Sequence, residues 1–235
     1  MRNLYFLSVM LAGMITACSK HPVVVNPPDQ QTFPLSRFSR VVTGESFSLQ
    51  IQRADRFEIL ATGDRRDLDD LVVYQTTGGI LHLEYRNART GRNPVSFHIS
   101  LPTLTGMILS GSQQASVSGF GGQNSVIRTV LSGTARCTIQ DASANIGFDL
   151  QGSSILTVKG ATESLYGSLG ENARLFAHEL YATEVDISAS GSSQAHVYPM
   201  QSLFAEANDE SRIFYQGNPP ITQLTTGGNG QILKY

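Results

Sequence analysis

The chain has 235 residues, with 17 Lys and Arg against 19 Asp and Glu, and only 15% of the residues are charged. A formal net charge of −2 leaves no basic surplus for a nucleic-acid backbone, so nucleic acid is not an expected partner. A hydrophobic content of 40% without a 20-residue apolar run excludes both a disordered chain and a helical membrane protein.

The first residues have the pattern of an export signal. Arg2 supplies a positive charge, residues 4–14 form an apolar segment too short to span a bilayer, and small residues follow. The stretch Ile15-Thr16-Ala17-Cys18 resembles the bacterial lipobox, and this resemblance implies cleavage before Cys18 and acylation of that cysteine. We therefore expect a signal peptide over residues 1–17 and a lipoprotein anchored to a membrane through Cys18.

Residues 18–36 are predicted to form a Pro-rich tether between the lipid and the folded part of the chain. They contain four prolines with Asn, Asp and Gln and show no periodicity. Ser19-Lys20-His21 lacks the acidic run that serves some envelope lipoproteins as a surface-export address. The expected location is therefore the outer membrane, facing the periplasm. With Cys18 acylated, Cys137 has no partner for an intramolecular disulfide.

Residues 37–104 are predicted to form antiparallel-type strands with one short helix. Apolar and polar residues alternate over 47–51, 81–85 and 95–101. Asp64 is expected to cap a helix that begins at Arg65, and Thr77-Gly78-Gly79 is expected to form a tight turn. His82 and His98 occupy polar positions of neighbouring strands and could face each other. Two histidines without a third ligand make a poor metal site, so neither a metal nor another cofactor is predicted.

Residues 105–235 contain an internal repeat. A turn motif recurs with its third residue, usually glycine, at intervals of 18 to 22 residues. A fixed period near 20 residues is the signature of a solenoid, in which each repeat buries its apolar face against its neighbours. The third residues of the seven turns are Gly111, Gly133, Gly152, Glu171, Gly191, Asp209 and Gly228.

Apolar residues recur with a period of two on both sides of each turn. The columns six, four and two positions before the third residue, and four and six positions after it, are mostly apolar. Short strands wound into a coil and stacked in parallel account for this combination of periods. The sequence therefore predicts an all-β fold, a β-helix or β-solenoid of about seven coils of 18–22 residues, which is expected to form one structural unit with residues 37–104. Cys137 lies in an inward column and is predicted to be a buried small residue.

The chain resembles the putative auto-transporter adhesin, head GIN domain family of bacterial envelope proteins. The resemblance covers about residues 38–235. It is carried by the repeated turns such as Leu109-Ser110-Gly111-Ser112, by Ser100-Leu101-Pro102-Thr103-Leu104, and by Tyr215-Gln216-Gly217-Asn218-Pro219. It implies a β-helix-like solenoid preceded by strands, and no established catalytic residues.

One outward face of the last coils is unusually aromatic. Aromatic rings with interleaved Arg, Gln and His suit an extended glycan or a protein edge, because rings bury area while amides and guanidinium groups fix orientation. The alternatives are that this face packs against the N-terminal strands or a second copy, or that it is solvated. The candidate binding residues are Arg174, Phe176, His178, His196, Tyr198, Arg212 and Phe214.

Catalysis is the rival function, because β-helices also host polysaccharide-acting enzymes. Such enzymes need clustered carboxylates, but Asp149 and Asp186 fall in different columns and Glu206 lies three coils from Asp149. A non-enzymatic, adhesin-like binding module is therefore predicted. A structural role is the second alternative, in which the open edge of the last coil or the aromatic face mediates self-association into a homo-oligomer.

Overall fold

The computed structural model describes residues 28–122 and 126–235. The predicted signal peptide, Cys18 and most of the predicted tether lie outside the described residues. The fold is all-β with one short helix, as predicted, and no described helix is long and apolar enough to cross a membrane.

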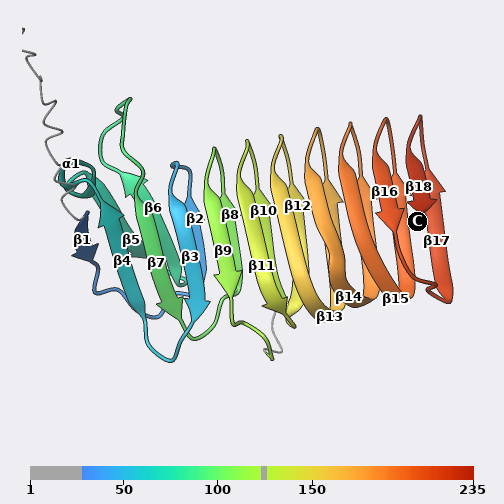
Figure 1. Cartoon of the computed structure of the whole chain (residues 1–235), viewed down its shortest axis with the longest axis horizontal. Coiled ribbons are helices and arrows are strands. Elements are labelled where there is room, and N and C mark those ends of the chain that lie inside the picture. The colour runs from blue at the N-terminus through green and yellow to red at the C-terminus, as the bar shows by residue number, and fades with distance from the viewer. Residues whose placement is uncertain (1–27, 123–125) are drawn as a thin grey trace, which may run out of the picture.

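The repeats form a β-solenoid, with its turns aligned in a row along the top of Figure 1. Seven strand–turn–strand units, from β8–β9 to β17–β18, wind through about six full turns. Successive units pair in parallel, and the longest strands bend at a corner to serve two units. The strands are β8 (Gly106–Leu109), β9 (Gln114–Ser118), β10 (Val126–Leu131), β11 (Arg136–Ala142), β12 (Asn145–Leu150), β13 (Ile155–Leu169), β14 (Arg174–Ala189), β15 (Gln194–Ala207), β16 (Arg212–Tyr215), β17 (Ile221–Thr226) and β18 (Gln231–Lys234).

Each unit contributes one strand to each of two opposing sheet faces. The strand before the turn belongs to face 1, and the strand after the turn belongs to face 2. Face 1 contains β8, β10, β12, β17 and the second halves of β13, β14 and β15. Face 2 contains β9, β11, β16, β18 and the first halves of β13, β14 and β15.

The third residue of each turn has a positive φ, as the frequent glycine at this position indicates. Gly133 and Gly152 have φ of 70° and 72°, and the two exceptions, Glu171 and Asp209, adopt the same conformation at 55° and 59°. The turns stack directly on one another, since the amide of Ser153 donates to the carbonyl of Gly133 at 2.7 Å. A Cβ on Gly133 would lie 2.8 Å from the carbonyl oxygen of Gly111, so glycine is favoured at this position.

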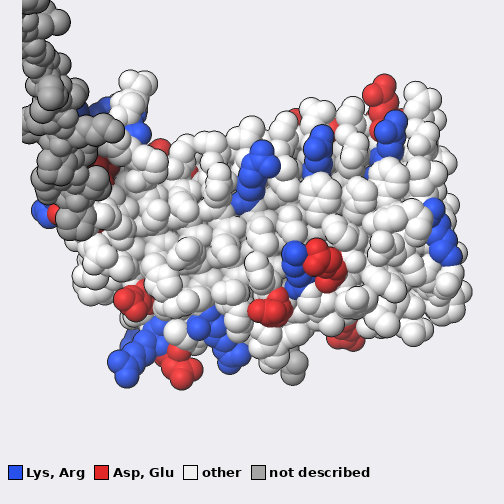
Figure 2. Space-filling view, viewed as in Figure 1, with Lys and Arg blue, Asp and Glu red and all other residues white. Residues whose placement is uncertain are grey.

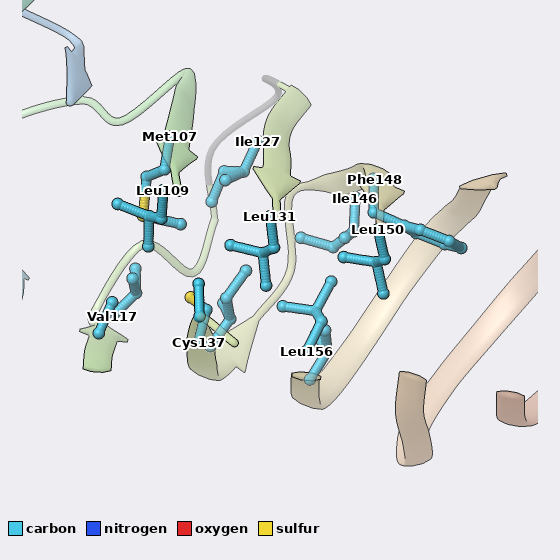
Figure 3. Close-up of a cluster of buried hydrophobic side chains, with 14 of the residues drawn as sticks. Met107, Leu109, Val117, Ile127, Leu131, Cys137, Ile146, Phe148, Leu150 and Leu156 are labelled. Carbon is cyan, nitrogen blue, oxygen red and sulfur yellow. The ribbon is translucent and has the colours of Figure 1, made fainter. Parts of the chain in front are cut away.

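The apolar columns fill the space between the two faces, as predicted. Leu109, Leu131 and Leu150 point inward in successive units, each fully buried (Figure 3). Cys137 lies among them at 2% exposure, and burial raises the pKa of its thiol to about 12. Such a thiol stays protonated at neutral pH, so Cys137 serves as a small core residue and not as a nucleophile.

Part of the N-terminal region extends the solenoid, which corrects the expectation of antiparallel strands throughout. The strands β2 (Arg40–Thr43) and β3 (Ser48–Arg53) pair in parallel with β8 and β9. On their other side they pair in parallel with β6 (Ile80–Tyr85) and β7 (Ser96–Leu101). The later pair β6–β7 thus lies outside the earlier pair β2–β3. Face 1 therefore begins with β6 and β2, and face 2 begins with β7 and β3.

Antiparallel strands and the helix are confined to the N-terminal end of the solenoid, at the left of Figure 1. There β5 (Leu71–Thr76) pairs with β6, β4 (Glu58–Gly63) pairs with β7, and β1 (Asp29–Thr32) pairs with β4. The helix α1 (Arg65–Leu68) is capped as predicted, because the Asp64 carboxylate accepts a hydrogen bond from the Arg66 amide at 2.9 Å. These elements cover an end that would otherwise expose strand edges.

The suggested pairing of His82 with His98 is wrong. Because β6 and β7 are the two strands of one coil, these side chains lie on opposite faces. The His82 ring stacks on Tyr74 with centroids 4.8 Å apart, and the His98 ring nitrogen lies 2.8 Å from the amide nitrogen of Gln52. Among residues 28–122 and 126–235, no group of three or more His, Cys, Asp or Glu side chains is placed to hold a metal ion.

The C-terminal coil lacks such a cover in the described structure. All six residues of β17 are exposed, and Leu224, which points inward, is 42% exposed. The open edge predicted for the last coil is therefore present.

Candidate functional site

An aromatic ladder runs along face 2 through the last coils. Phe176 on β14, His196 on β15 and Phe214 on β16 are paired in register, so their side chains follow one another along the solenoid. The Phe176 and His196 rings stack with centroids 5.6 Å apart, and the His196 and Phe214 rings with centroids 4.7 Å apart. The structure therefore stacks three of the seven predicted site residues in one ladder.

Two further rings border this ladder. His178 contacts Phe176 and His196 edge to face, at centroid distances of 6.5 and 6.2 Å. Tyr235 is nearly perpendicular to His196 and Phe214, and its hydroxyl lies 3.5 Å from His196 Nδ1. We refer to Phe176, His178, His196, Phe214 and Tyr235 as the aromatic surface. Tyr235 was not among the predicted site residues, although it lies seven positions after its turn residue, the same offset as the predicted residue His178.

His196 at the centre of the aromatic surface favours the neutral form. Partial burial, with a smaller contribution from neighbouring His178, lowers the pKa of His196 below its usual value of 6.5. The neutral imidazole packs between Phe176 and Phe214 without the cost of desolvating a charge. In Figure 2 uncharged residues make up most of the face toward the viewer, and Lys and Arg side chains stand in a row along its upper part.

The remaining predicted residues lie at the margins of this surface. Arg174 and Arg212 are exposed on the turn side of the ladder, two coils apart, and neither forms an ion pair with another described residue. Tyr198 is not part of the ladder. A register shift between β14 and β15 pairs it with Tyr181, and the two rings lie 4.9 Å apart at the corner of the coil.

The N-terminal strands do not cover the aromatic surface. They pair beside β8 and β9, at the opposite end of the solenoid from β16 and β18. Of the alternatives for this face, packing against the N-terminal strands is therefore wrong. Contact with a second copy and solvation stay open.

The carboxylates that a hydrolase or lyase would need are placed on face 1. Asp149 and Asp186 lie in different columns, as predicted. Asp186 and Glu206 come from successive coils and line the same shallow cavity of about 300 Å³, although they occupy different columns. That cavity contains no Lys, Arg or His to serve as a partner. A pair of exposed acids without such a partner does not establish a catalytic site.

Fold and surface together define a β-solenoid protein with an outward, half-buried aromatic face. Residues 37–219 match the family model described as putative auto-transporter adhesin, head GIN domain. Since this match spans most of the chain, the protein belongs to that family, as the resemblance indicated. A search of curated proteins found no match.

Solved structures share the fold at low sequence identity. A putative adhesin from Bacteroides fragilis superposes with a TM-score of 0.77 at 15% identity, covering 88% of this chain and 97% of that one. A putative adhesin from Parabacteroides merdae gives 0.64 at 14% identity, with coverages of 90% and 97%. A putative lipid binding protein from Parabacteroides distasonis gives 0.62 at 18% identity, with coverages of 90% and 98%. At these identities the likeness establishes the fold alone.

Proposed function

We propose that this protein is a non-catalytic, adhesin-like component of the cell envelope whose aromatic surface binds a protein partner. The observation that carries the proposal is the stack of Phe176, His196 and Phe214, whose half-buried rings line the outward side of a regular sheet face. The adhesin description of the family and of two structural neighbours supports a binding role.

The orientation of the rings favours a protein over a glycan. In the ladder the ring faces of Phe176, His196 and Phe214 are stacked on one another, so the rings present their edges outward. A sugar ring packs on an aromatic face, whereas aromatic edges carry partial positive charge and attract carbonyl and carboxylate oxygens. Arg174 and Arg212 add donors for the same oxygens. A peptide segment offers these acceptors along its whole length.

A glycan is the second candidate because two tyrosines are less enclosed. Tyr181 is 50% exposed and Tyr235 is 55% exposed, so each retains ring area for a sugar. A protein partner requires the ladder, whereas a glycan partner requires these two tyrosines.

Truncation of the ladder tests the proposal. The double variant Phe176→Ala with Phe214→Ala is expected to weaken binding to an envelope-protein partner at least tenfold, since buried aromatic anchors dominate interfaces and each contributes roughly 2 kcal/mol. Binding is measured by surface plasmon resonance against envelope proteins identified by cross-linking, with a glycan array in parallel. The matched control is Ser116→Ala with Thr138→Ala, which alters the same column in earlier coils. Equal affinity of wild type and ladder variant would refute the proposal.

We further propose that the chain is anchored to the outer membrane through acylated Cys18, facing the periplasm. The support is the lipobox resemblance, because Cys18 lies outside the described residues. The Cys18→Ser variant is expected to shift from the membrane fraction to the soluble fraction, since each buried CH₂ of an acyl chain contributes about 0.8 kcal/mol to membrane binding. Palmitate labelling and fractionation measure this shift, and protease treatment of intact cells tests the orientation. Unchanged labelling and membrane retention of the variant would contradict anchoring at this site.

A further inference from the structure

Face 1 carries charge of opposite sign on two groups of strands, which we call its basic half and its acidic half. The basic half consists of β2, β8 and β10, whose charged residues are Arg40 and Arg128, and acidic Glu84 on β6 and Asp149 on β12 lie on either side of it. From the second half of β13 to β17 the charged residues of this face are all acidic: Glu163, Glu184, Asp186 and Glu206. Arg40, Arg128 and Asp186 form no ion pair with any residue that the structure describes. The two halves of the face are therefore complementary to each other, but they cannot meet within one molecule.

The basic half also contains an apolar hollow. Its floor is Gly106, where a Cβ would lie 2.8 Å from the carbonyl oxygen of Arg128. The hollow measures about 370 Å³. A cavity of roughly 150 Å³ accommodates benzene, so the hollow has room for a phenyl ring. Ile108 beside it is 48% exposed. Its other lining side chains are Arg40, Val42, Ile80, Arg128 and Val130.

The hollow and the charges share one row of outward positions along face 1. From the N-terminal end, the hydrogen-bonded register gives the order Ile80, Arg40, Gly106, Arg128, Gly147, Tyr166, Asp186, Phe204 and Gln223. Phe204 lies five coils from Gly106, and Asp186 lies three coils from Arg128. Both pairs have the same midpoint, between Gly147 and Tyr166.

We propose that two copies of this chain associate through face 1 in an antiparallel arrangement, about a two-fold axis that passes between Gly147 and Tyr166. In this arrangement Phe204 of each copy enters the hollow over the partner's Gly106, and Asp186 meets the partner's Arg128. One axis position satisfies the apolar pair and the charge pair together, as an isologous interface requires.

The available area is sufficient for a specific dimer. The row from Arg40 to Gln223 spans seven coil spacings, about 34 Å, and a six-residue strand is about 20 Å long. Each copy then contributes about 700 Å², so the total exceeds the roughly 1,000 Å² expected of a biological interface. The aromatic surface lies on face 2 and stays accessible, so this proposal does not depend on the proposed function.

Charge reversal and its compensation test the dimer. The wild-type mature domain, residues 19–235, is expected to sediment as a dimer at micromolar concentration. Arg128→Asp alone and Asp186→Arg alone are each expected to raise the dimer dissociation constant at least tenfold, because each places like charges together at two symmetric sites. The double variant Arg128→Asp with Asp186→Arg is expected to restore dimerisation. Arg136→Asp, at an exposed residue of β11 on face 2, is the matched control and is expected to leave the dimer unchanged.

Three results would overturn the proposal. One is a wild-type monomer at 200 µM by sedimentation velocity. Another is a dimer that persists in both single charge-reversal variants, which would place self-association at the β17–β18 edge or on face 2. The third is failure of the compensated double variant to dimerise while its circular dichroism and thermal midpoint match those of the wild type. Phe204→Ala gives an independent readout, since it leaves the charges intact and is expected to weaken the dimer at least tenfold.

Discussion

Replacement of Gly167 by alanine is expected to destabilise the fold by about 3 kcal/mol, because it combines backbone strain with overpacking. Gly167 lies within β13 at an inward position, with a φ of 151° that L-residues rarely adopt. A Cβ there would collide with the carbonyl oxygen of Phe148 and would lie 2.9 Å from its ring. Phe148 is 3% exposed and packed among the leucines of the core, so its ring has no free space into which to move.

The measurement is urea denaturation followed by circular dichroism, with the free energy of unfolding extrapolated to water. Gly91→Ala is the matched control. Gly91 also has a positive φ, 67°, but nothing lies within 4 Å of a Cβ added there. Its substitution measures only the cost of placing an alanine at a left-handed φ, about 1 kcal/mol of unfolding free energy. Equal destabilisation by the two substitutions would show that the Phe148 ring does not need the space left at Gly167.

The stacking of the solenoid could be predicted from the sequence because it repeats. Each inward column offers up to seven observations of the same environment, and a turn glycine such as Gly152 recurs at the same place in most coils. The repeat does not explain why Gly167 is a glycine. It occupies an inward column that is otherwise mostly apolar, and only the packing of Phe148 against it explains the missing side chain.

The N-terminal topology could not be predicted, because no repeat constrains it. Alternation over residues 81–85 and 95–101 indicates half-buried strands, but it does not say whether their neighbours run parallel or antiparallel. The β2–β3 coil precedes β6–β7 in sequence but lies between β6–β7 and β8–β9 in the solenoid. The order along the solenoid therefore differs from the order in sequence. That choice depends on contacts between distant segments.

The candidate site could be predicted in part because it also lies in the repeat. Each ladder residue stands five positions after its turn residue, which places all three in one column, and the structure stacks them: Phe176, His196 and Phe214. Tyr198 has the offset of His178, yet it contacts Tyr181, because β14 advances four residues where β15 advances one at that corner. Coil lengths of 20 and 18 residues meet there, and column counting cannot locate the difference.

Replacement of Asp67 by alanine is expected to cost about 3 kcal/mol, because it leaves Arg89 without a counter-charge and leaves Arg92 with Asp70 alone. The Asp67 carboxylate, 3% exposed, accepts hydrogen bonds from Arg89, from Arg92 at 3.4 Å and from the Asn93 amide at 3.0 Å. The Arg92 side chain is 12% exposed and its guanidinium carbon lies 3.5 Å from the centre of the Tyr85 ring. Removing one member of a largely buried ion cluster costs more than the cluster contributes, because the remaining charges stay desolvated.

This cluster joins α1 to the loop between β6 and β7, so its loss is expected to act first on the N-terminal cover of the solenoid. Asp69→Asn is the matched control. It breaks the Arg65–Asp69 pair on the same helix, where both side chains are more than half exposed, and is expected to cost less than about 0.5 kcal/mol. Hydrogen exchange followed by mass spectrometry should show faster exchange in α1, β4 and β5 of the Asp67 variant while β13 to β15 keep wild-type protection. Equal unfolding free energies for the Asp67 and Asp69 variants would mean that the cover is held by its apolar contacts, Leu68 and Leu71 among them, and not by the buried charges.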